Sequence, residues 1–290
     1  MGPADASTAG LAPDLCRTRR GPGCRCRPGL PVSDLTGRTV VITGGDKGIG
    51  RAITRRFLTA GANVAIGVHD PDSVAAAEKD IDGGDRVHVA PCDVTVAQAV
   101  AAFADAVTGR FGRVDVVIAN AGVAGPIAPL HAISPDEWRQ CIDVDLTGVF
   151  LTFRAFIPEM IKLRSGTLIA VSSVTGKRPL ANRTPYAAAK MGIIGLVRSL
   201  ALELGPFGIR ANTVCPGSVD GPRMDAVFEA AAAAGGMSVP EARGEHTGPA
   251  ALGRLVKADE VADLCLFLAG DSASAITGAD VNVSAGSVMN

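Results

Sequence analysis

The stretch RTVVITGGDKGIGRAITRRFLTAG, Arg38 to Gly61, decides the fold. It begins with a short run rich in β-branched residues, passes through a glycine-rich turn, and continues as a helical pattern that stops at Gly61. A strand that turns into a helix through glycines is typical of the first unit of a doubly wound α/β fold. The stretch therefore predicts a Rossmann-like sheet.

The same alternation of strand and helix continues to the end of the chain. Strand patterns recur at residues 63–68, 87–94, 114–122, 166–173, 209–217 and 280–285. Helical patterns lie between them, after the expected capping boxes at Thr95 and Ser134, over residues 186–204 and over residues 258–270. Strands separated in this way form right-handed βαβ units. We expect one domain over residues 35–290, with a parallel sheet of about seven strands and helices on both faces.

Composition excludes several classes of function. The net charge is −1, which favours neither nucleic acid nor an anionic membrane as a partner, and no apolar run reaches the length of a membrane span. The cysteine count is seven, an odd number, and no signal peptide is recognisable. A cytoplasmic location is therefore expected. Cys24 and Cys26 lack the spacing of zinc or redox motifs, so no metal site is predicted.

Two segments depart from the alternating pattern. Residues 1–34 are rich in Pro, Gly and Arg and show no periodicity, so a disordered extension is expected there. Residues 220–253 are rich in Ala and Gly and contain three prolines. We interpret this second segment, called the lid segment below, as an irregular insertion near the site.

The glycine-rich turn suggests a ligand. Gly44, Gly48 and Gly50 have the spacing G-x-x-x-G-x-G between the first strand and the first helix. Glycines allow the backbone to approach a ligand closely, and the N-terminus of the following helix offers unpaired N–H groups that suit a pyrophosphate. A glycine-rich turn without a cofactor remains the alternative.

Tyr186 is the only tyrosine of the chain, and Lys190 follows one helical turn later. Residues at i and i+4 share a helix face, and a neighbouring ammonium favours the ionised form of a phenol. Such a phenol is suited to general acid or base chemistry. Ser173 ends a strand at the carboxyl edge of the sheet, where a hydroxyl can orient a substrate oxygen. The alternative is a tyrosine that packs its ring beside a solvated lysine.

Taken together, these motifs resemble the classical short-chain dehydrogenase/reductases. The motifs are the Gly44–Gly50 turn, Asn120-Ala121-Gly122, Ser173, Tyr186-x-x-x-Lys190 and Pro216-Gly217, and the resemblance covers Leu35 to the C-terminus. It implies that Tyr186 is the general acid/base, that Lys190 assists it and binds the nicotinamide ribose, and that Ser173 positions the substrate oxygen. The cofactor-binding residues it implies are Gly44, Lys47, Gly48, Ile49, Gly50, His69, Asp93, Val94, Asn120, Gly122, Tyr186, Lys190, Pro216, Gly217 and Val219.

The chain departs from the family pattern at informative positions. Asp145 stands where the family usually has the asparagine of its catalytic tetrad, and we expect it to serve in its place. The second strand ends at Val68, where NAD enzymes usually place an acid. With Lys47 and His69 nearby, NADP(H) is favoured over NAD(H), although Asp70 is a possible ribose ligand.

The resemblance predicts an oxidoreductase that transfers a hydride between a nicotinamide cofactor and a secondary alcohol or ketone. The alternatives are a catalytically silent cofactor-sensing protein and a non-redox epimerase or dehydratase. The expected substrate walls are residues 123–131, residues 174–184 and the lid segment, with Lys177 and Arg178 as candidates for receiving an acidic group or as a solvated face. The family also implies a homo-oligomer, a tetramer or a dimer.

Overall fold

The computed structural model describes residues 34–289, except the side chains of Ala230, Ala234 and His246. They contain a seven-stranded sheet in the order β3-β2-β1-β4-β5-β6-β7, in which every neighbouring pair is parallel. The strands are β1 (Thr39–Thr43), β2 (Asn63–Val68), β3 (Val87–Pro91), β4 (Val116–Ala119), β5 (Gly166–Val171), β6 (Ile209–Pro216) and β7 (Asp280–Val283). The predicted doubly wound parallel sheet is confirmed. The extension expected at residues 1–34 lies, apart from Asp34, outside the described residues.

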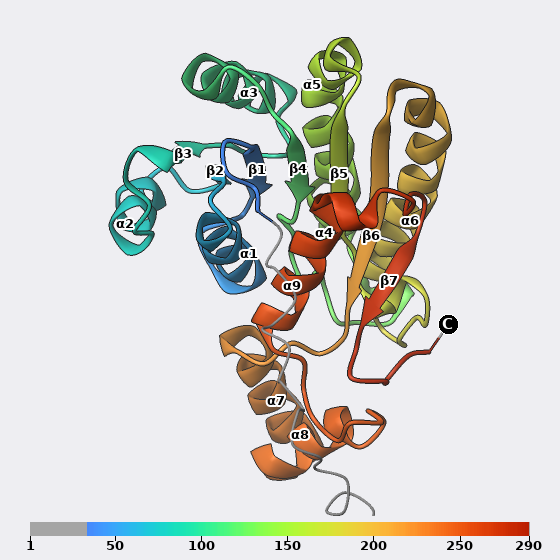
Figure 1. The fold of residues 1–290 in the computed structure, drawn as a ribbon. Coiled ribbons are helices and arrows are strands. Elements are labelled where there is room, and N and C mark those ends of the chain that lie inside the picture. Colours follow the sequence, from blue (N-terminus) through green and yellow to red (C-terminus); the bar gives the residue numbers. More distant parts are fainter. Residues whose placement is uncertain (1–33, 290) are drawn as a thin grey trace, which may run out of the picture. The chain divides into compact units, whose positions relative to one another are not determined.

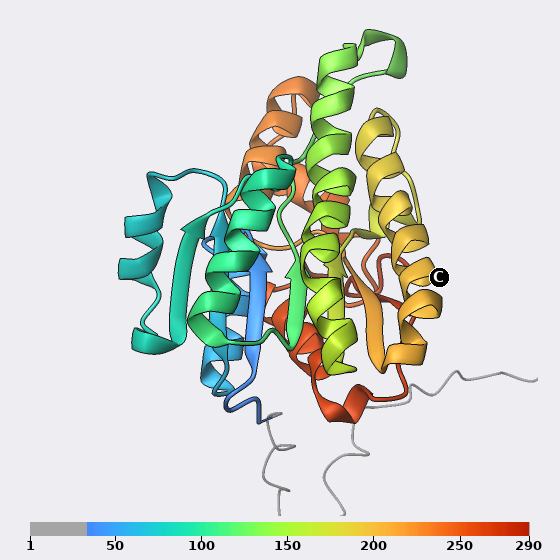
Figure 2. The ribbon, with the colours of Figure 1, turned by 90° about the horizontal axis from the view of Figure 1, so that it is seen from above.

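Helices cover both faces of the sheet (Figures 1 and 2). On one face, α1 (Gly48–Thr59), α2 (Ser73–Asp80) and α9 (Ala258–Ala269) enclose a core that includes Ile53, Phe57 and Val261. On the other face, α3 (Ala97–Phe111), α5 (Gly148–Leu163) and α6 (Thr184–Leu204) enclose a core with Phe153 and Ile193. Because strands buried on both faces need apolar residues throughout, the continuous apolar runs in the sequence become central strands.

The topology fixes where a ligand can bind. β1 lies between β2 and β4. From β1 to β3 the strands are added on one side of β1, and from β4 onward they are added on its other side. In open α/β sheets, ligands bind at the carboxyl ends of the strands next to this switch point. The glycine turn after β1 and the segment that follows β4 both lie at this edge.

Three helix starts test the capping predictions. α4 (Pro135–Ile142) begins with the predicted capping box, in which Ser134 and Glu137 bond reciprocally. The capping box expected at Thr95 is wrong, because Asp93 binds both the hydroxyl and the N–H of Thr95 and leaves α3 without a side-chain cap. α6 begins at Thr184 itself, after Arg183, and Thr184 does not cap it.

The lid segment is helical rather than irregular. It contains α7 (Pro222–Gly235) and α8 (Val239–Thr247), and Ser238 forms a capping box with Glu241. The two helices share a small core of their own with Phe228 and Ala242. They follow β6 and lie beyond the end of the sheet from which that strand emerges (Figure 1). Across residues 34–289, no helix combines the length and the apolar character needed to cross a membrane.

Candidate active site

The glycine turn after β1 is held in place by Asn120, which follows β4. The side-chain amide of Asn120 donates hydrogen bonds to the carbonyl oxygens of Thr43 and Gly44, each at 3.0 Å. The Thr43 hydroxyl accepts from the N–H groups of Asn120 at 3.0 Å and Ala121 at 3.1 Å. Gly44 has a φ of +62°, which favours glycine. These bonds join the ends of β1 and β4 across the switch point.

The turn has the properties of a pyrophosphate cradle. α1 begins after Lys47 with no side-chain cap and with no acidic residue in its first turn. The first N–H groups of this helix therefore have no capping side chain and carry the positive end of the helix dipole. A Cβ on Gly50 would lie 2.0 Å from the Gly44 carbonyl oxygen, so the backbone here approaches more closely than any side chain permits. The turn fits an anionic cofactor.

Replacing Gly50 by Ala is expected to weaken cofactor binding at least about tenfold, since the new methyl group displaces the Gly44 carbonyl and the Asn120 amide 2.6 Å away. Fluorescence titration with NADPH and NADH measures the change. Gly109→Ala on α3 is the matched control, because a Cβ there meets nothing within 4 Å. That control should leave cofactor affinity unchanged and raise stability by about 0.5–1 kcal/mol. Equal affinities for both variants would refute the cradle.

The end of β2 carries no acid directed at a ribose. Val68 ends the strand and is buried. Asp70 is occupied locally, because its carboxylate accepts from the Asp72 N–H and from the Ser73 hydroxyl, each at 3.0 Å. Lys47 is 82% exposed and has only Asp46 nearby, at 3.7 Å. His69 is equally exposed and lies 3.7 Å from Asp93. The positive groups thus remain accessible at this edge, while the candidate acid is engaged.

The residues expected near adenine follow β3. The Cys92 N–H donates to the Val68 carbonyl at 2.6 Å and ties this segment to β2. Asp93 binds Thr95, and Val94 is buried against Gly148 at the start of α5. The side chain of Val94 therefore packs inward, and only its backbone remains for a ligand at this edge.

The predicted catalytic residues of β5 and α6 converge. Ser173 follows β5, and its hydroxyl accepts from the Thr175 N–H at 3.1 Å. The neighbouring Ser172 hydroxyl donates to the Lys190 carbonyl at 2.8 Å. The Lys190 ammonium donates to the Val171 carbonyl at 3.3 Å and lies 5.5 Å from the centre of the Tyr186 ring. The lysine of the predicted pair is thus buried beneath the tyrosine rather than solvated.

Asp145 completes this buried cluster. It lies in a π-helical turn, Asp143–Thr147, that joins α4 to α5, and π-turns of this kind often occur at functional sites. Asp145 is fully buried, accepts from the Val123 N–H at 2.8 Å, and has its Oδ1 atom 4.0 Å from the Lys190 ammonium. Its other oxygen lies 3.9 Å from the Cys141 sulfur. The carboxylate and the lysine therefore form a buried ion pair.

Gly122 links the cluster to the glycine turn. A Cβ on Gly122 would lie 2.8 Å from Asp145 Oδ1 and 3.4 Å from the Lys190 ammonium. Two residues earlier, Asn120 holds Gly44. The segment after β4 thus contacts the glycine turn through Asn120 and approaches Asp145 and Lys190 through Gly122. This arrangement places both halves of the predicted site at one edge of the sheet.

Burial raises the pKa of Asp145 above its ordinary value, and the charge of Lys190 opposes this rise. The folded protein therefore keeps this proton to a higher pH than the unfolded chain does. Relative to Asp145→Asn, the wild type should show an unfolding free energy that is constant below about pH 4 and falls as pH rises above it. Urea titrations of both proteins across this range measure the difference. A difference that grows in favour of the wild type with rising pH contradicts the assignment.

The Pro216–Val219 turn is fixed from two sides. The Gly217 N–H donates to the Val283 carbonyl of β7 at 2.9 Å, and a Cβ on Gly217 would lie 3.0 Å from the Ser284 backbone. Val219 pairs with Val256, which follows the lid segment. The turn therefore leads from β6 into the lid at a fixed position.

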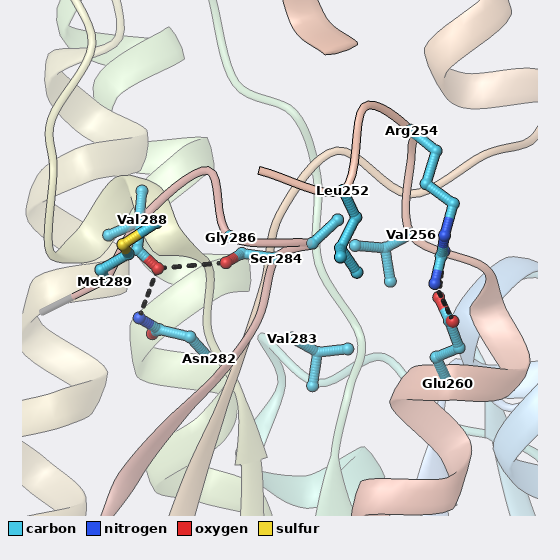
Figure 3. Close-up of a pocket in the computed structure, with 11 residues that line it drawn as sticks. Leu252, Arg254, Val256, Glu260, Asn282, Val283, Ser284, Gly286, Val288 and Met289 are labelled. Atoms are coloured by element: carbon cyan, nitrogen blue, oxygen red, sulfur yellow. Dashed lines mark hydrogen bonds and ion pairs between the residues drawn. The ribbon is translucent and has the colours of Figure 1, made fainter. Parts of the chain in front are cut away.

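Two pockets lie near these elements. A pocket of about 520 Å³ is lined by residues that include Val256, Val283, Ser284, Val288 and Met289 (Figure 3). Asn282 and Ser284 point to the Val288 carbonyl on one side, and Arg254 pairs with Glu260 on the other (Figure 3). None of the predicted catalytic residues lines it. A smaller pocket of about 240 Å³ is lined by Val123, Gly125, Pro126, Glu137, Gln140 and Cys141, and it borders the catalytic cluster.

The structure brings in residues that the motifs did not indicate. The Arg183 guanidinium lies over the Tyr186 ring, 4.8 Å from its centre, and Cys141 touches Asp145. The signal for Arg183 was its place three residues before the tyrosine, at the start of the helix. Lys177, a candidate for binding an acidic group of the substrate, is already paired within the protein. Its side chain is only 10% exposed and pairs with Asp280 at 2.7 Å.

Comparisons with known proteins agree on one family. The sequence model of the family described as Enoyl-(Acyl carrier protein) reductase matches residues 44–287. A cis-4-hydroxycyclohexanecarboxylate dehydrogenase of Sinomonas cyclohexanicum is 38% identical over 251 residues, 86% of this chain and 96% of the relative. A 3-oxoacyl-(acyl-carrier-protein) reductase of Thermotoga maritima is 34% identical over 256 residues, 88% of this chain and 99% of the relative. A solved actinorhodin polyketide ketoreductase with NADPH has a TM-score of 0.82 and 30% identity, and the match covers 86% and 96% of the two chains.

Proposed function

We propose a mechanism, a cofactor and a substrate class for this chain, which belongs to the short-chain dehydrogenase/reductase family. The chain is an oxidoreductase that acts on CH–OH groups or the corresponding ketones with a nicotinamide cofactor. The single observation that supports the mechanism best is the cluster of the half-buried Tyr186 with the buried Lys190 and Asp145 beside the glycine turn.

In the proposed mechanism, Tyr186 exchanges a proton with the oxygen of the substrate. Ser173 holds the same oxygen, since its hydroxyl lies at the end of β5 and is fixed by Thr175. Lys190 places a positive charge 5.5 Å from the centre of the Tyr186 ring, and Asp145 keeps that lysine in place. The cofactor, when bound, supplies or accepts the hydride. The residues of this chain supply the orientation and the proton.

The glycine turn and the segment after β4 would hold the cofactor. Gly44, Gly48, Ile49 and Gly50 cradle the pyrophosphate at the start of α1. Asn120 and Gly122 flank the adenosine side and the reacting side of this crevice. On the far side, the turn with Pro216, Gly217 and Val219 would bind the nicotinamide amide. Asp93 and Val94 would border the adenine.

NADP(H) is the proposed cofactor. Val68 offers no carboxylate to a ribose, and Asp70 is occupied by Asp72 and Ser73. The exposed Lys47 ammonium lies 3.7 Å from Asp46, and His69 lies at the same edge, 3.7 Å from Asp93. A 2′-phosphate at this position would compete with Asp46 for the exposed lysine and would form a charge-assisted contact with it.

Parallel fluorescence titrations with NADPH and NADH test this preference. We expect NADPH to bind about tenfold more tightly, because one charge-assisted contact contributes about 1.5 kcal/mol or more. Lys47→Gln should remove most of this difference, whereas Lys162→Gln on the exposed face of α5 should not. Tighter binding of NADH by the wild type would show that the phosphate site is wrong.

The proposed substrate is a secondary alcohol or ketone on a ring. The Ala128 N–H donates to the Asn182 carbonyl at 3.1 Å, so the two expected walls, residues 123–131 and 174–184, contact each other. The lid segment would form the third wall, and Met224 and Met237 pack on its own small core. Among the relatives, two are named for a 4-hydroxycyclohexanecarboxylate and one structure for a polyketide, which also supports a substrate larger than a short linear alcohol.

A homo-oligomer and a cytoplasmic location belong to the same proposal. The family resemblance implies an oligomer contact through the helices near residues 135–163 and 186–204. Large apolar side chains are exposed on these helices, namely Trp138, Phe150, Met191 and Leu202. Light scattering should therefore give the mass of a dimer or tetramer. Within the described chain, Cys92, Cys141, Cys215 and Cys265 are buried free thiols, which suits a reducing compartment.

A further inference from the structure

Two arginines near the catalytic cluster have no acidic partner among the described residues. Most arginines of the described chain form ion pairs, namely Arg38, Arg51, Arg56, Arg110, Arg113, Arg139, Arg198, Arg243 and Arg254. Within residues 34–289, Arg183 and Arg223 make neither an ion pair nor a side-chain hydrogen bond. A guanidinium presents five N–H donors, so the donors of Arg183, which lies over the Tyr186 ring, are available to a ligand.

Arg183 stands at the reacting tyrosine. It is the last residue before α6, it is half-buried, and its guanidinium lies 4.8 Å from the centre of the Tyr186 ring. The preceding carbonyl, of Asn182, bonds to Ala128, so Arg183 is placed where two proposed substrate walls meet. Burial and Asp145 raise the pKa of the Cys141 thiol to about 11, and the charges of Lys190 and Arg183 oppose that rise. The charge of Arg183 is therefore felt inside the cluster.

Arg223 approaches from the lid segment. It lies in the first turn of α7, is exposed, and contributes a positive charge at the buried carboxyl of Asp145. The other lid arginine, Arg243, is already neutralised by Asp220 at 2.8 Å and Asp225 at 4.0 Å. Of these two lid arginines, Arg223 is thus the one that lacks an acidic partner among the described residues.

We propose that the substrate carries a carboxylate, a few carbon atoms from its reacting carbon, that binds Arg183. This inference rests on the proposed function, because it concerns the substrate of the same site. A carboxylate matches the planar fork of a guanidinium and accepts two parallel hydrogen bonds from it. Such a contact on the half-buried Arg183 would select acidic ketones over neutral ones of the same shape.

The test compares two ketones that differ in charge. With NADPH at a saturating concentration, kcat/KM is measured for 4-oxocyclohexanecarboxylate and for its methyl ester. The wild type should prefer the acid by about tenfold to a hundredfold, the ratio expected for a charge-assisted contact. In Arg183→Gln, kcat/KM should fall for the acid and stay unchanged for the ester, so most of the ratio is lost. Arg183→Lys should recover part of the ratio. Arg55→Gln, an exposed arginine on α1, is the control and should keep the ratio.

The outcomes separate the two proposals. Equal turnover of acid and ester by the wild type, or an equal loss of both in Arg183→Gln, overturns the carboxylate site and makes Arg183 a support for the Tyr186 ring. The proposed function itself fails only if the wild type reduces neither these two ketones nor neutral cyclohexanone.

Discussion

The Tyr186→Phe variant is expected to lose about a thousandfold in kcat while its dissociation constant for NADPH stays within about twofold of the wild-type value. Proton transfer by a positioned side chain contributes about 10²–10⁴-fold to a rate, and the phenolic hydroxyl is the only group that the variant lacks. The ring remains, so its contacts with Arg183 and Lys190 are kept. Steady-state kinetics with cyclohexanone and a fluorescence titration with NADPH measure the two quantities.

The contrast between rate and binding is the informative part of this experiment. A loss of both would mean that the hydroxyl is needed to assemble the cofactor site, so the proton-transfer role would not follow. A variant that keeps more than about a tenth of the wild-type kcat would rule out Tyr186 as the general acid/base. An unchanged unfolding midpoint in urea would show that the fold is intact.

Replacing Lys190 by Met should abolish turnover and lower the free energy of unfolding by about 3 kcal/mol at neutral pH. Removing one partner of a buried ion pair leaves the other charge without compensation, and Asp145 is fully buried 4.0 Å away. The ammonium also loses its bond to the Val171 carbonyl, which joins α6 to β5. Urea denaturation and steady-state kinetics give the two losses.

A double variant distinguishes stability from catalysis. Lys190→Met combined with Asp145→Asn removes both charges, so most of the lost stability should return while turnover should not. Lys162→Met, on an exposed pair with Glu159, should cost less than about 1 kcal/mol. If the double variant is no more stable than Lys190→Met alone, the two groups are not coupled in the way that the geometry implies.

The sheet was predictable because local pattern and tertiary environment agree along it. β1, β2 and β4 are short apolar runs that become buried on both faces, and the glycine turn after β1 requires a positive φ at Gly44. The start of α4 was equally predictable, since Ser134 and Glu137 satisfy each other within one turn. Where an interaction closes within a few residues, the sequence alone is sufficient to place it.

The lid segment was misread for a physical reason. Its Ala- and Gly-rich composition and its prolines are typical of irregular chain, yet Pro222 and Pro240 lie in the first turns of α7 and α8, where proline is tolerated. The capping box of Ser238 and Glu241 was present in the sequence and marks the start of α8. At Thr95, conversely, a capping pattern failed because Asp93 bound the threonine first.

The charges of the site depend on contacts that are distant in sequence. The spacing of Tyr186 and Lys190 was readable, but not the burial of Lys190 against Asp145, which lies on another helical segment. Lys177 pairs with Asp280, about a hundred residues away, and this pairing removes it from the substrate walls. Of the two cations next to the Tyr186 ring, Lys190 pairs with Asp145, whereas Arg183 has no acidic partner among the described residues. A motif does not encode this difference.

Hydride transfer from the cofactor and proton transfer by Tyr186 are tested most directly by following deuterium from the cofactor to the product. The protein is incubated with cyclohexanone and NADPH that carries deuterium at both C4 positions, and the alcohol is analysed by mass spectrometry. We expect one deuterium on the carbinol carbon in the wild-type reaction and almost no labelled alcohol with Tyr186→Phe. Alcohol that forms without deuterium, or labelled alcohol formed equally by the Tyr186→Phe variant, would contradict this expectation.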